Sequence, residues 1–347
     1  MQSEIPIVGI TVGDPAGVGP EIVVKALSDP ALFKCIRPVV YADGCVLEAG
    51  RKAAGSTVVL RKVAGPAEAR FAAGTIDYVE AGVLTAPVPY GVVSAAGGRA
   101  AFTYLDRAID AALAGEVDGL ATAPLNKESL QAAASPFIDH TAILEARAAL
   151  RAPMTLFMAQ TLKIFFLTRH ISLRQVPGAI TREGISAAIP LCLDYLRQLG
   201  AEDPLLAVAA LNPHGGEQGL FGMEESDIIA PAVAQARAQG YRVAGPVPAD
   251  AVFHQAREGR YGGVLSLYHD QGHIAAKTLD FYGTVSLTMG LRFLRTSVDH
   301  GTAFDIAGRG IADARSMVAA LQAAGQYSLA VKARVPLTRA TSELPGL

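Results

Sequence analysis

Three histidines stand close behind short apolar runs of the chain, where their side chains could bind a metal ion together. They are His170, His214 and His269. If the apolar runs are parallel strands, the loops that follow them face one crevice. Three imidazoles can hold a divalent cation and leave a position open for water or a substrate oxygen. Each histidine taken singly is more typical of a capping or core residue, so the pattern alone leaves both interpretations open.

Two cations follow this histidine group in the chain. Lys277 and Arg295 belong to a sequence of near-neutral charge, and apolar residues such as Phe293 and Leu294 surround the arginine. Arg offers a bidentate fork to phosphate or carboxylate, whereas Lys offers a point charge. The apolar surroundings favour an anion-binding role over an ordinary solvated surface. His273 follows His269 by one helical turn. It could support the metal ligands from behind, or it could be a loop residue without a role in the site.

A glycine-rich segment, GDPAGVGPE at 13–21, follows the first apolar run. It matches neither the GxGxxG fingerprint nor a P-loop. The start of a helix at this point would offer free N–H groups to an anion. A tight strand-to-helix turn explains the glycines equally well.

The elements that must position these residues are short apolar runs alternating with Ala-rich segments of helical period. This alternation predicts an α/β fold with a largely parallel sheet, covered on both faces. We find no internal repeat and no Pro/Gly/Ser-rich linker. If the protein has two lobes, they share a continuous sheet or the chain crosses between them more than once. The strands are expected at 5–12, 162–167, 205–211 and 264–268, and the helices at 99–114, 183–199, 226–239 and 312–324.

Composition excludes several classes of protein. The 347 residues include 30 Lys and Arg against 32 Asp and Glu, which leaves no basic surplus for nucleic acid. No apolar run approaches the roughly 18 residues of a membrane span, and the first residues do not resemble a signal peptide. Cys35, Cys45 and Cys192 have no paired spacing. We therefore expect a cytoplasmic protein with reduced thiols.

Five motifs carry a resemblance to a known family. GDPAGVGPEI, ATAPLNKE, NPHGGEQGLFGMEE, YHDQGH and RTSVDHGTAFDIAGRG occur in this order from Gly13 to Gly310. Together they resemble the 4-hydroxythreonine-4-phosphate dehydrogenases. The resemblance implies the two-lobed isocitrate/isopropylmalate dehydrogenase type of fold, with the active site in the interlobe cleft of a homodimer. The implied lobes are residues 1–132 with about 303–347, and about 133–302.

The resemblance also assigns residues. It implies metal ligation by His170, His214 and His269, supported by Asp250 and Asp270; catalysis by these histidines with Asp270 and Lys277; substrate binding by His140, Thr141, Lys277, Ser286 and Arg295; and cofactor binding by Gly13, Asp14, His300, Gly301 and Asp305. The sequence departs from the family at Ser286, Arg292 and Asp139, where Asn, Pro and Gly are usual. These departures concern the substrate pocket.

The reaction implied is an NAD-dependent, metal-assisted oxidation of a secondary alcohol, followed by decarboxylation, in a phosphorylated four-carbon acid. NADP is the alternative cofactor, and zinc is favoured over cobalt or magnesium. His273-Ile274 and Phe304-Asp305-Ile306 resemble paralogues that oxidise 4-phospho-D-threonate or 4-phospho-D-erythronate. An amino group in place of the hydroxyl would give 4-phosphohydroxy-L-threonine and pyridoxine biosynthesis instead.

Three alternatives remain at this point. Terephthalate dihydrodiol dehydrogenases share HDQGHI and DIAGRG with this chain, but they lack the arginine that stands here at 295. A β-decarboxylating dehydrogenase that holds its metal with aspartates is disfavoured by the three histidines. A non-catalytic binding protein for phosphorylated acids would need only the cations and a cleft.

Overall fold

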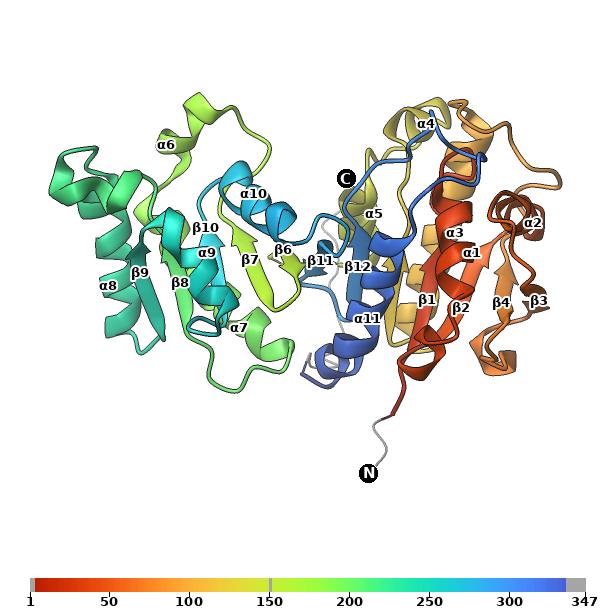
Figure 1. The fold of residues 1–347 in the computed structure, drawn as a ribbon, viewed down its shortest axis with the longest axis horizontal. Coiled ribbons are helices and arrows are strands. Elements are labelled where there is room, and N and C mark those ends of the chain that lie inside the picture. Colours follow the sequence, from red (N-terminus) through yellow and green to blue (C-terminus); the bar gives the residue numbers. More distant parts are fainter. Residues whose placement is uncertain (1–3, 150–151, 335–347) are drawn as a thin grey trace, which may run out of the picture.

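The computed structural model describes residues 4–149 and 152–334. Its strands form one 12-stranded sheet in the order β3-β4-β2-β1-β5-β12-β11-β6-β7-β10-β8-β9 (Figure 1). The strands are β1 (Ile7–Thr11), β2 (Arg37–Ala42), β3 (Val59–Val63), β4 (Thr75–Glu80), β5 (Gly119–Thr122), β6 (Met154–Ala159), β7 (Leu162–Phe166), β8 (Leu206–Ala209), β9 (Val243–Val247), β10 (Gly263–Ser266), β11 (Val285–Met289) and β12 (Leu294–Val298).

Helices connect most of these strands. They are α1 (Gly19–Leu27), α2 (Gly44–Ala53), α3 (Ala95–Ala114), α4 (Lys127–Ala132), α5 (His140–Ala148), α6 (Val176–Ala179), α7 (Arg182–Gln198), α8 (Ala230–Ala238), α9 (Ala249–Arg257), α10 (His269–Leu279) and α11 (Arg315–Arg334). The α/β fold predicted from the alternating pattern is confirmed. The predicted strands and most of the predicted helices fall on these elements to within a few residues, whereas α11 continues ten residues beyond its predicted end at 324.

The sheet is parallel at both ends and antiparallel in the middle. β11 runs antiparallel to both of its neighbours, β6 and β12, and β6 runs antiparallel to β7. The sheet is continuous across the predicted lobe boundary, because β12 also pairs in parallel with β5. The lobe boundaries themselves stay a prediction, and 335–347 of the first predicted lobe lie outside the described residues.

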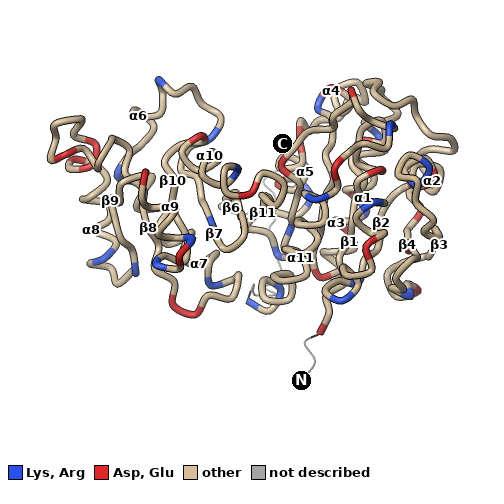
Figure 2. The backbone as a smooth tube through the Cα atoms, viewed as in Figure 1, with Lys and Arg blue, Asp and Glu red and all other residues tan. Residues whose placement is uncertain are grey.

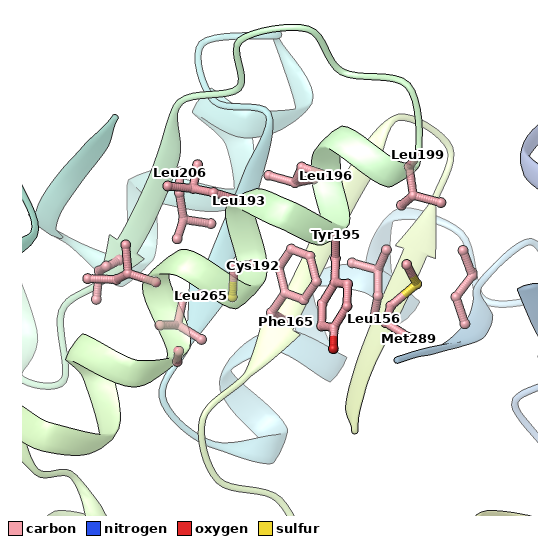
Figure 3. Packing of buried hydrophobic residues seen from close by; sticks show 14 of the residues in the cluster. Leu156, Phe165, Cys192, Leu193, Tyr195, Leu196, Leu199, Leu206, Leu265 and Met289 are labelled. Carbon is pink, nitrogen blue, oxygen red and sulfur yellow. The ribbon is translucent and has the colours of Figure 1, made fainter. Parts of the chain in front are cut away.

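Both faces of the sheet are buried, as the continuous apolar strands predict. Along β7, Phe165 packs with α7 and α8 on one face, whereas Ile164 and Phe166 pack with α9 and α10 on the other. Figure 3 shows the first of these clusters. Burying one such side chain stabilises the fold by roughly 1.5–3 kcal/mol, so the strand cores are rigid supports for the loops that follow them.

Helix α7 illustrates how local sequence builds this packing. The Thr181 hydroxyl accepts a hydrogen bond from the Gly184 amide and caps the helix. Ile185, Ile189 and Leu193 then recur every fourth residue, and all three are fully buried. Gly200 with a positive φ follows the helix, as the sequence predicts.

Within the described parts of the chain, no helix combines the length and apolar character that crossing a membrane requires. Acidic and basic residues are interspersed over both halves of the molecule (Figure 2).

Candidate functional site

A cavity of about 210 Å³ lies at the antiparallel centre of the sheet. It brings together six of the residues singled out from the sequence and several that were not. Its lining is Thr141, Thr155, Phe157, Arg169, His170, His269, His273, Ser286, Thr288, Arg295 and Asp299. Polar groups from four strands or their following loops thus converge on one small space.

Arg295 is the most buried charged group of this cavity. Only 6% of the residue is exposed on β12. Its Nε and Nη2 donate to Thr122 Oγ1 at 3.0 and 2.7 Å, and its Nη1 donates to Thr288 Oγ1 at 3.1 Å. Burial lowers the pKa of Arg295 to about 10, while the charge of Asp139 acts in the opposite direction. Arg295 is therefore a buried cation with hydroxyl partners, an arrangement that suits an incoming anion.

The start of α5 lies against this arginine. The Asp139 carboxylate caps the helix by accepting from the Ala142 amide at 3.0 Å. Burial and the charge of Arg295 hold the pKa of His140 well below its usual range. Its imidazole is consequently neutral at neutral pH, and the neighbouring Thr141 faces the cavity. The predicted His-Thr pair is thus placed beside the predicted arginine.

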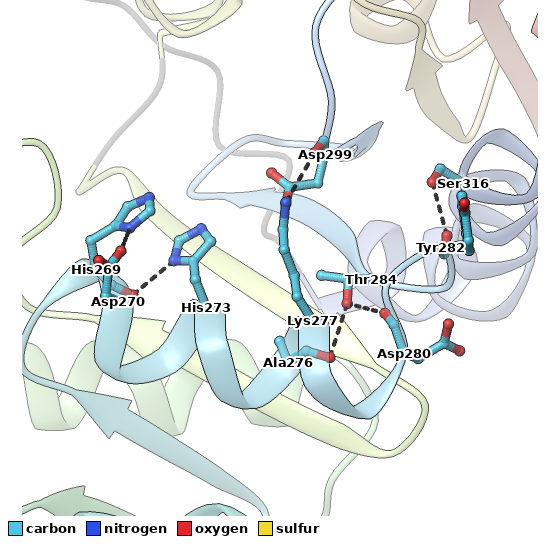
Figure 4. Close-up of polar contacts among 10 residues, drawn as sticks. All are labelled: His269, Asp270, His273, Ala276, Lys277, Asp280, Tyr282, Thr284, Asp299 and Ser316. Atoms are coloured by element: carbon cyan, nitrogen blue, oxygen red, sulfur yellow. Dashed lines mark hydrogen bonds and ion pairs between the residues drawn. The ribbon is translucent and has the colours of Figure 1, made fainter. Parts of the chain in front are cut away.

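His170 and His269 face the same cavity, with ring centroids 5.8 Å apart. Partial burial and the charge of Arg169 lower the pKa of His170, which keeps its lone pair available. His269 Nδ1–H donates to Asp270 Oδ1 at 2.6 Å, an arrangement that leaves Nε2 free. The ring of His273 stacks on that of His269 at 3.7 Å, and its Nδ1 donates to the His269 carbonyl (Figure 4). His273 therefore belongs to the site rather than to a plain loop.

His214, the third predicted ligand, does not line this cavity. It is exposed on the 213–219 loop, where residues 214–218 all have positive φ, from 44° to 81°. Asp250 is exposed on α9, which contacts the same loop. Among the described residues, no group of three or more His, Cys, Asp or Glu is close enough to hold a metal ion. Two imidazoles fit a zinc-like cation by chemistry, but one chain in this arrangement does not complete a site.

Glu225 fixes the position of the His214 loop. It is 5% exposed, and its Oε1 accepts from the amides of Leu211 and Asn212, each at 2.7 Å. Its Oε2 accepts from the Asn212 side-chain amide at 2.9 Å. Its role could not be recognised from the sequence, although Glu225 closes the NPHGGEQGLFGMEE motif. A buried carboxylate thus satisfies the backbone where β8 leads into the loop.

Lys277 forms an ion pair with Asp299 at 2.8 Å (Figure 4). Its ammonium also lies 5.3 Å from the centroid of the Phe281 ring. Asp299 borders both the small cavity and a neighbouring cavity of about 610 Å³. The two cavities therefore adjoin at this acid, and Lys277 stands on the side of the larger one.

The larger cavity lies beside the predicted cofactor loop. Its lining includes the predicted His300 and Gly301, together with Val18, Ile22, Lys277, Phe281, Tyr282, Asp299, Ala303, Ile306, Ala312, Asp313 and Ser316. Asp305 is exposed and does not line this cavity. Arg315, which pairs with Asp313, lies 3.6 Å from the centroid of the Tyr282 ring. The space is large and mostly apolar, as ligand pockets in proteins usually are.

Gly13 and Asp14 have a structural place in this arrangement. Asp14 is 0% exposed, and its Oδ1 accepts from the Ala16 amide at 2.9 Å. Burial raises its pKa. A Cβ on Gly13 would lie 2.0 Å from the Pro124 carbonyl oxygen, and its φ is +66°. In this conformation the pair forms the tight strand-to-helix turn and reaches neither cavity.

A partly buried ion pair ties the loop beside the larger cavity to α1. Glu21 is 0% exposed and pairs with Lys25 at 2.7 Å. Glu21 also accepts from the Ala312 amide at 2.9 Å, while Lys25 donates to the carbonyls of Gly310 and Ala312, each at 2.8 Å. The GDPAGVGPE segment therefore serves the larger cavity in two ways, because Val18 lines the cavity and Glu21 holds the loop beside it.

Comparisons with known proteins identify the family of this chain. The family model described as "Pyridoxal phosphate biosynthetic protein PdxA" matches residues 34–324. A protein of Symbiobacterium thermophilum named "Putative D-threonate 4-phosphate dehydrogenase" is 50% identical over 328 residues, 94% of this chain and 98% of that protein. The structure of a 4-hydroxythreonine-4-phosphate dehydrogenase from Klebsiella pneumoniae is 41% identical, with a TM-score of 0.84 over 93% of this chain and 99% of that one.

A terephthalate 1,2-cis-dihydrodiol dehydrogenase from Burkholderia xenovorans LB400 is more distant, at 29% identity and a TM-score of 0.63 over 93% and 98% of the two chains. The chain belongs to the PdxA family. It is a dehydrogenase of that family. The resemblance drawn from the five motifs is thereby confirmed.

Proposed function

We propose that this dehydrogenase oxidises the secondary alcohol of a phosphorylated four-carbon hydroxy acid, with 4-phospho-D-threonate as the first candidate. The observation that carries the proposal is the buried Arg295, a cation whose partners in the fold are hydroxyls. The names of relatives at 45–50% identity support the same substrate class. A dihydrodiol carries no phosphoryl group that would compensate this charge, so we rank the terephthalate type second.

The names of relatives bear on the substituent next to the carboxylate. Relatives at 45–50% identity are named for D-threonate 4-phosphate, which carries a hydroxyl group at that carbon. The structure named for 4-hydroxythreonine 4-phosphate, which carries an amino group there, is 41% identical to this chain. We therefore favour 4-phospho-D-threonate or 4-phospho-D-erythronate over 4-phosphohydroxy-L-threonine, and sugar-acid catabolism over pyridoxine biosynthesis.

In this proposal Arg295 binds the phosphoryl group and the neutral His140 and Thr141 bond to its oxygens, while NAD occupies the larger cavity beside His300 and Gly301. Ser286 contacts the carbon chain from β11. Lys277 and Asp299, at the junction of the cavities, orient the alcohol toward the nicotinamide. Binding energy at the phosphoryl end then positions the carbon that loses hydride. Oxidation at C3 gives a 3-keto acid, which releases carbon dioxide because the ketone accepts the electrons of the breaking bond.

His170 and His269 are the residues that would hold a divalent metal, supported by Asp270. Such a cation, when bound, lowers the pKa of an alcohol that it contacts. The family generally uses NAD and a divalent metal. Histidine ligands favour zinc or cobalt over magnesium.

We further propose a homodimer in which the 213–219 loop contacts a second copy. Leu220, Phe221 and Met223 follow on this segment with exposures of 75%, 50% and 51%. Burying such side chains between chains would be favourable. In this dimer the histidine of the loop would reach the site of the other copy, which accounts for its absence from the cavity of its own chain.

One substrate panel tests the proposal. The purified enzyme is given 4-phospho-D-threonate, 4-phospho-D-erythronate, 4-phosphohydroxy-L-threonine or the cis-dihydrodiol of terephthalate, each with NAD and with NADP. We expect reduced NAD and carbon dioxide in equal amounts from a phosphorylated hydroxy acid. A preference for the dihydrodiol, or binding of the phosphorylated acids without any turnover, would refute it.

A further inference from the structure

Three side chains form a row across the centre of the sheet. Thr155 on β6 lies opposite Thr288 on β11, and Thr288 lies opposite Arg295 on β12. Residues directly opposite on neighbouring antiparallel strands share a face of the sheet, with Cβ atoms about 5 Å apart. All three line the small cavity. The sheet register therefore places two hydroxyls side by side at its floor.

A separate arginine is bound to each of these hydroxyls. Arg295 Nη1 donates to Thr288 Oγ1 at 3.1 Å. Arg169, from the loop that follows β7, donates through Nη1 to Thr155 Oγ1. Arg169 is half-buried and lines the same cavity. Two guanidinium groups are thus held over neighbouring hydroxyls, although they come from elements far apart in the sequence.

The acids around these arginines are paired elsewhere. Asp299 Oδ2 forms an ion pair with Lys277 Nζ at 2.8 Å, and Asp139 Oδ2 lies 3.8 Å from Lys127 Nζ. Two cations held near each other in a partly buried space repel unless an anion lies between them. Because each is a planar fork with several N–H donors, an anion with several acceptor oxygens satisfies both.

We propose that Arg169 is a second anion-binding residue of this site, and that it binds the same phosphoryl group as Arg295. The inference rests on the proposed function and deepens it, because it makes a dianion the preferred ligand. A carboxylate carries one negative charge and would leave one of the two arginines uncompensated. A phosphate monoester carries nearly two charges at neutral pH and has three free oxygens.

Direct binding of inorganic phosphate tests the inference without turnover. Isothermal titration calorimetry compares the parent with Arg169→Gln, Arg169→Lys and the control Arg174→Gln. Arg174 follows in the same connection, is exposed and lines neither cavity described above. We expect Arg169→Gln to weaken phosphate binding by about 10- to 100-fold, the usual effect of losing a charge-assisted hydrogen bond. Arg169→Lys should recover part of the loss, and Arg174→Gln should match the parent. Equal phosphate affinity in Arg169→Gln and Arg174→Gln overturns the inference.

Turnover then identifies which end of the substrate Arg169 contacts. In Arg169→Gln, kcat/KM for 4-phospho-D-threonate should fall while kcat/KM for unphosphorylated D-threonate stays unchanged. An equal fall for both acids would assign Arg169 to the carboxylate and overturn the inference, although the proposed function would stand. If the parent oxidises neither acid, the proposed function fails, while phosphate titration still decides the role of Arg169. Thermal unfolding of each variant shows whether a loss reflects misfolding.

Discussion

Replacing Arg295 by Met should strongly reduce turnover of the phosphorylated substrate without destabilising the fold. A pKa lowered from 12.5 to about 10 corresponds to about 3 kcal/mol of unfavourable free energy for the buried charged form. This penalty is present at every pH below about 10 and is relieved only as the pH rises through that value. Met removes it at similar volume. The cost is the loss of hydrogen bonds to the Thr122 and Thr288 hydroxyls, about 1 kcal/mol each.

These opposing terms nearly cancel, so the melting temperature of Arg295→Met should stay within a few degrees of the parent. In catalysis, no favourable contribution offsets the loss of the contact between Arg295 and the substrate. Loss of a charge-assisted contact to a partly desolvated phosphoryl group costs about 2–5 kcal/mol. Because about 1.4 kcal/mol corresponds to a tenfold change in rate, kcat/KM for the phosphorylated substrate should fall by about 30-fold or more.

Two measurements check this reasoning. Thermal unfolding with and without inorganic phosphate should show stabilisation of the parent by phosphate and none of the variant. Steady-state kinetics should show the fall in kcat/KM with unchanged metal content. A melting temperature lower by ten degrees or more, together with normal turnover, would mean that Arg295 is a structural residue. Arg295→Lys should recover part of the activity, because it keeps the charge and loses the fork.

Further outcomes follow for the rest of the site. His170→Ala should lose most of its metal, as measured by elemental analysis, and its turnover; retention of both would contradict its assignment as a ligand. Light scattering should give twice 36.1 kDa, and an active monomer would count against the shared site. Co-expressed His170→Ala and His214→Ala chains should regain activity that neither has alone, since a mixed dimer would contain one intact site; no recovery would place all ligands in one chain. Glu225→Ala should speed amide exchange at Leu211 and Asn212 relative to the parent, because their shared acceptor is lost. Glu21→Ala should raise KM for NAD more than KM for the substrate, since it releases the loop beside the larger cavity; an unchanged KM for NAD would argue against cofactor binding there.

The sequence was sufficient for much of this molecule, because many of its signals are local. The cap at Thr181 and the fourfold spacing of Ile185, Ile189 and Leu193 define α7 without reference to the rest of the chain. Arg295 could be identified from its unusual apolar neighbours. These inferences needed only a residue and its near surroundings.

Other parts of the site depend on partners distant in sequence. Arg169 gave no signal of its own, because its role depends on the register that sets Thr155 beside Thr288. That register joins antiparallel strands that are over a hundred residues apart, and no local pattern encodes it. The burial of Asp14 is likewise imposed by segments distant in sequence. One of them contains Pro124, whose carbonyl oxygen accepts a hydrogen bond from the Asp14 amide. The position of His214 depends on a loop whose conformation is left-handed through five residues.

The continuity of the sheet has a consequence for how the anion site is prepared. β12 is hydrogen-bonded to β5 on one side and to β11 on the other, so the backbone beneath Arg295 and Thr288 is an interior part of the sheet. An interior strand cannot open without breaking both of its ladders, which makes its local unfolding as costly as that of the core. The arginine and its hydroxyl partners are therefore preorganised before a ligand arrives. Little of the binding free energy is then lost to ordering the site, and more of it remains to hold the reacting end of the substrate in place.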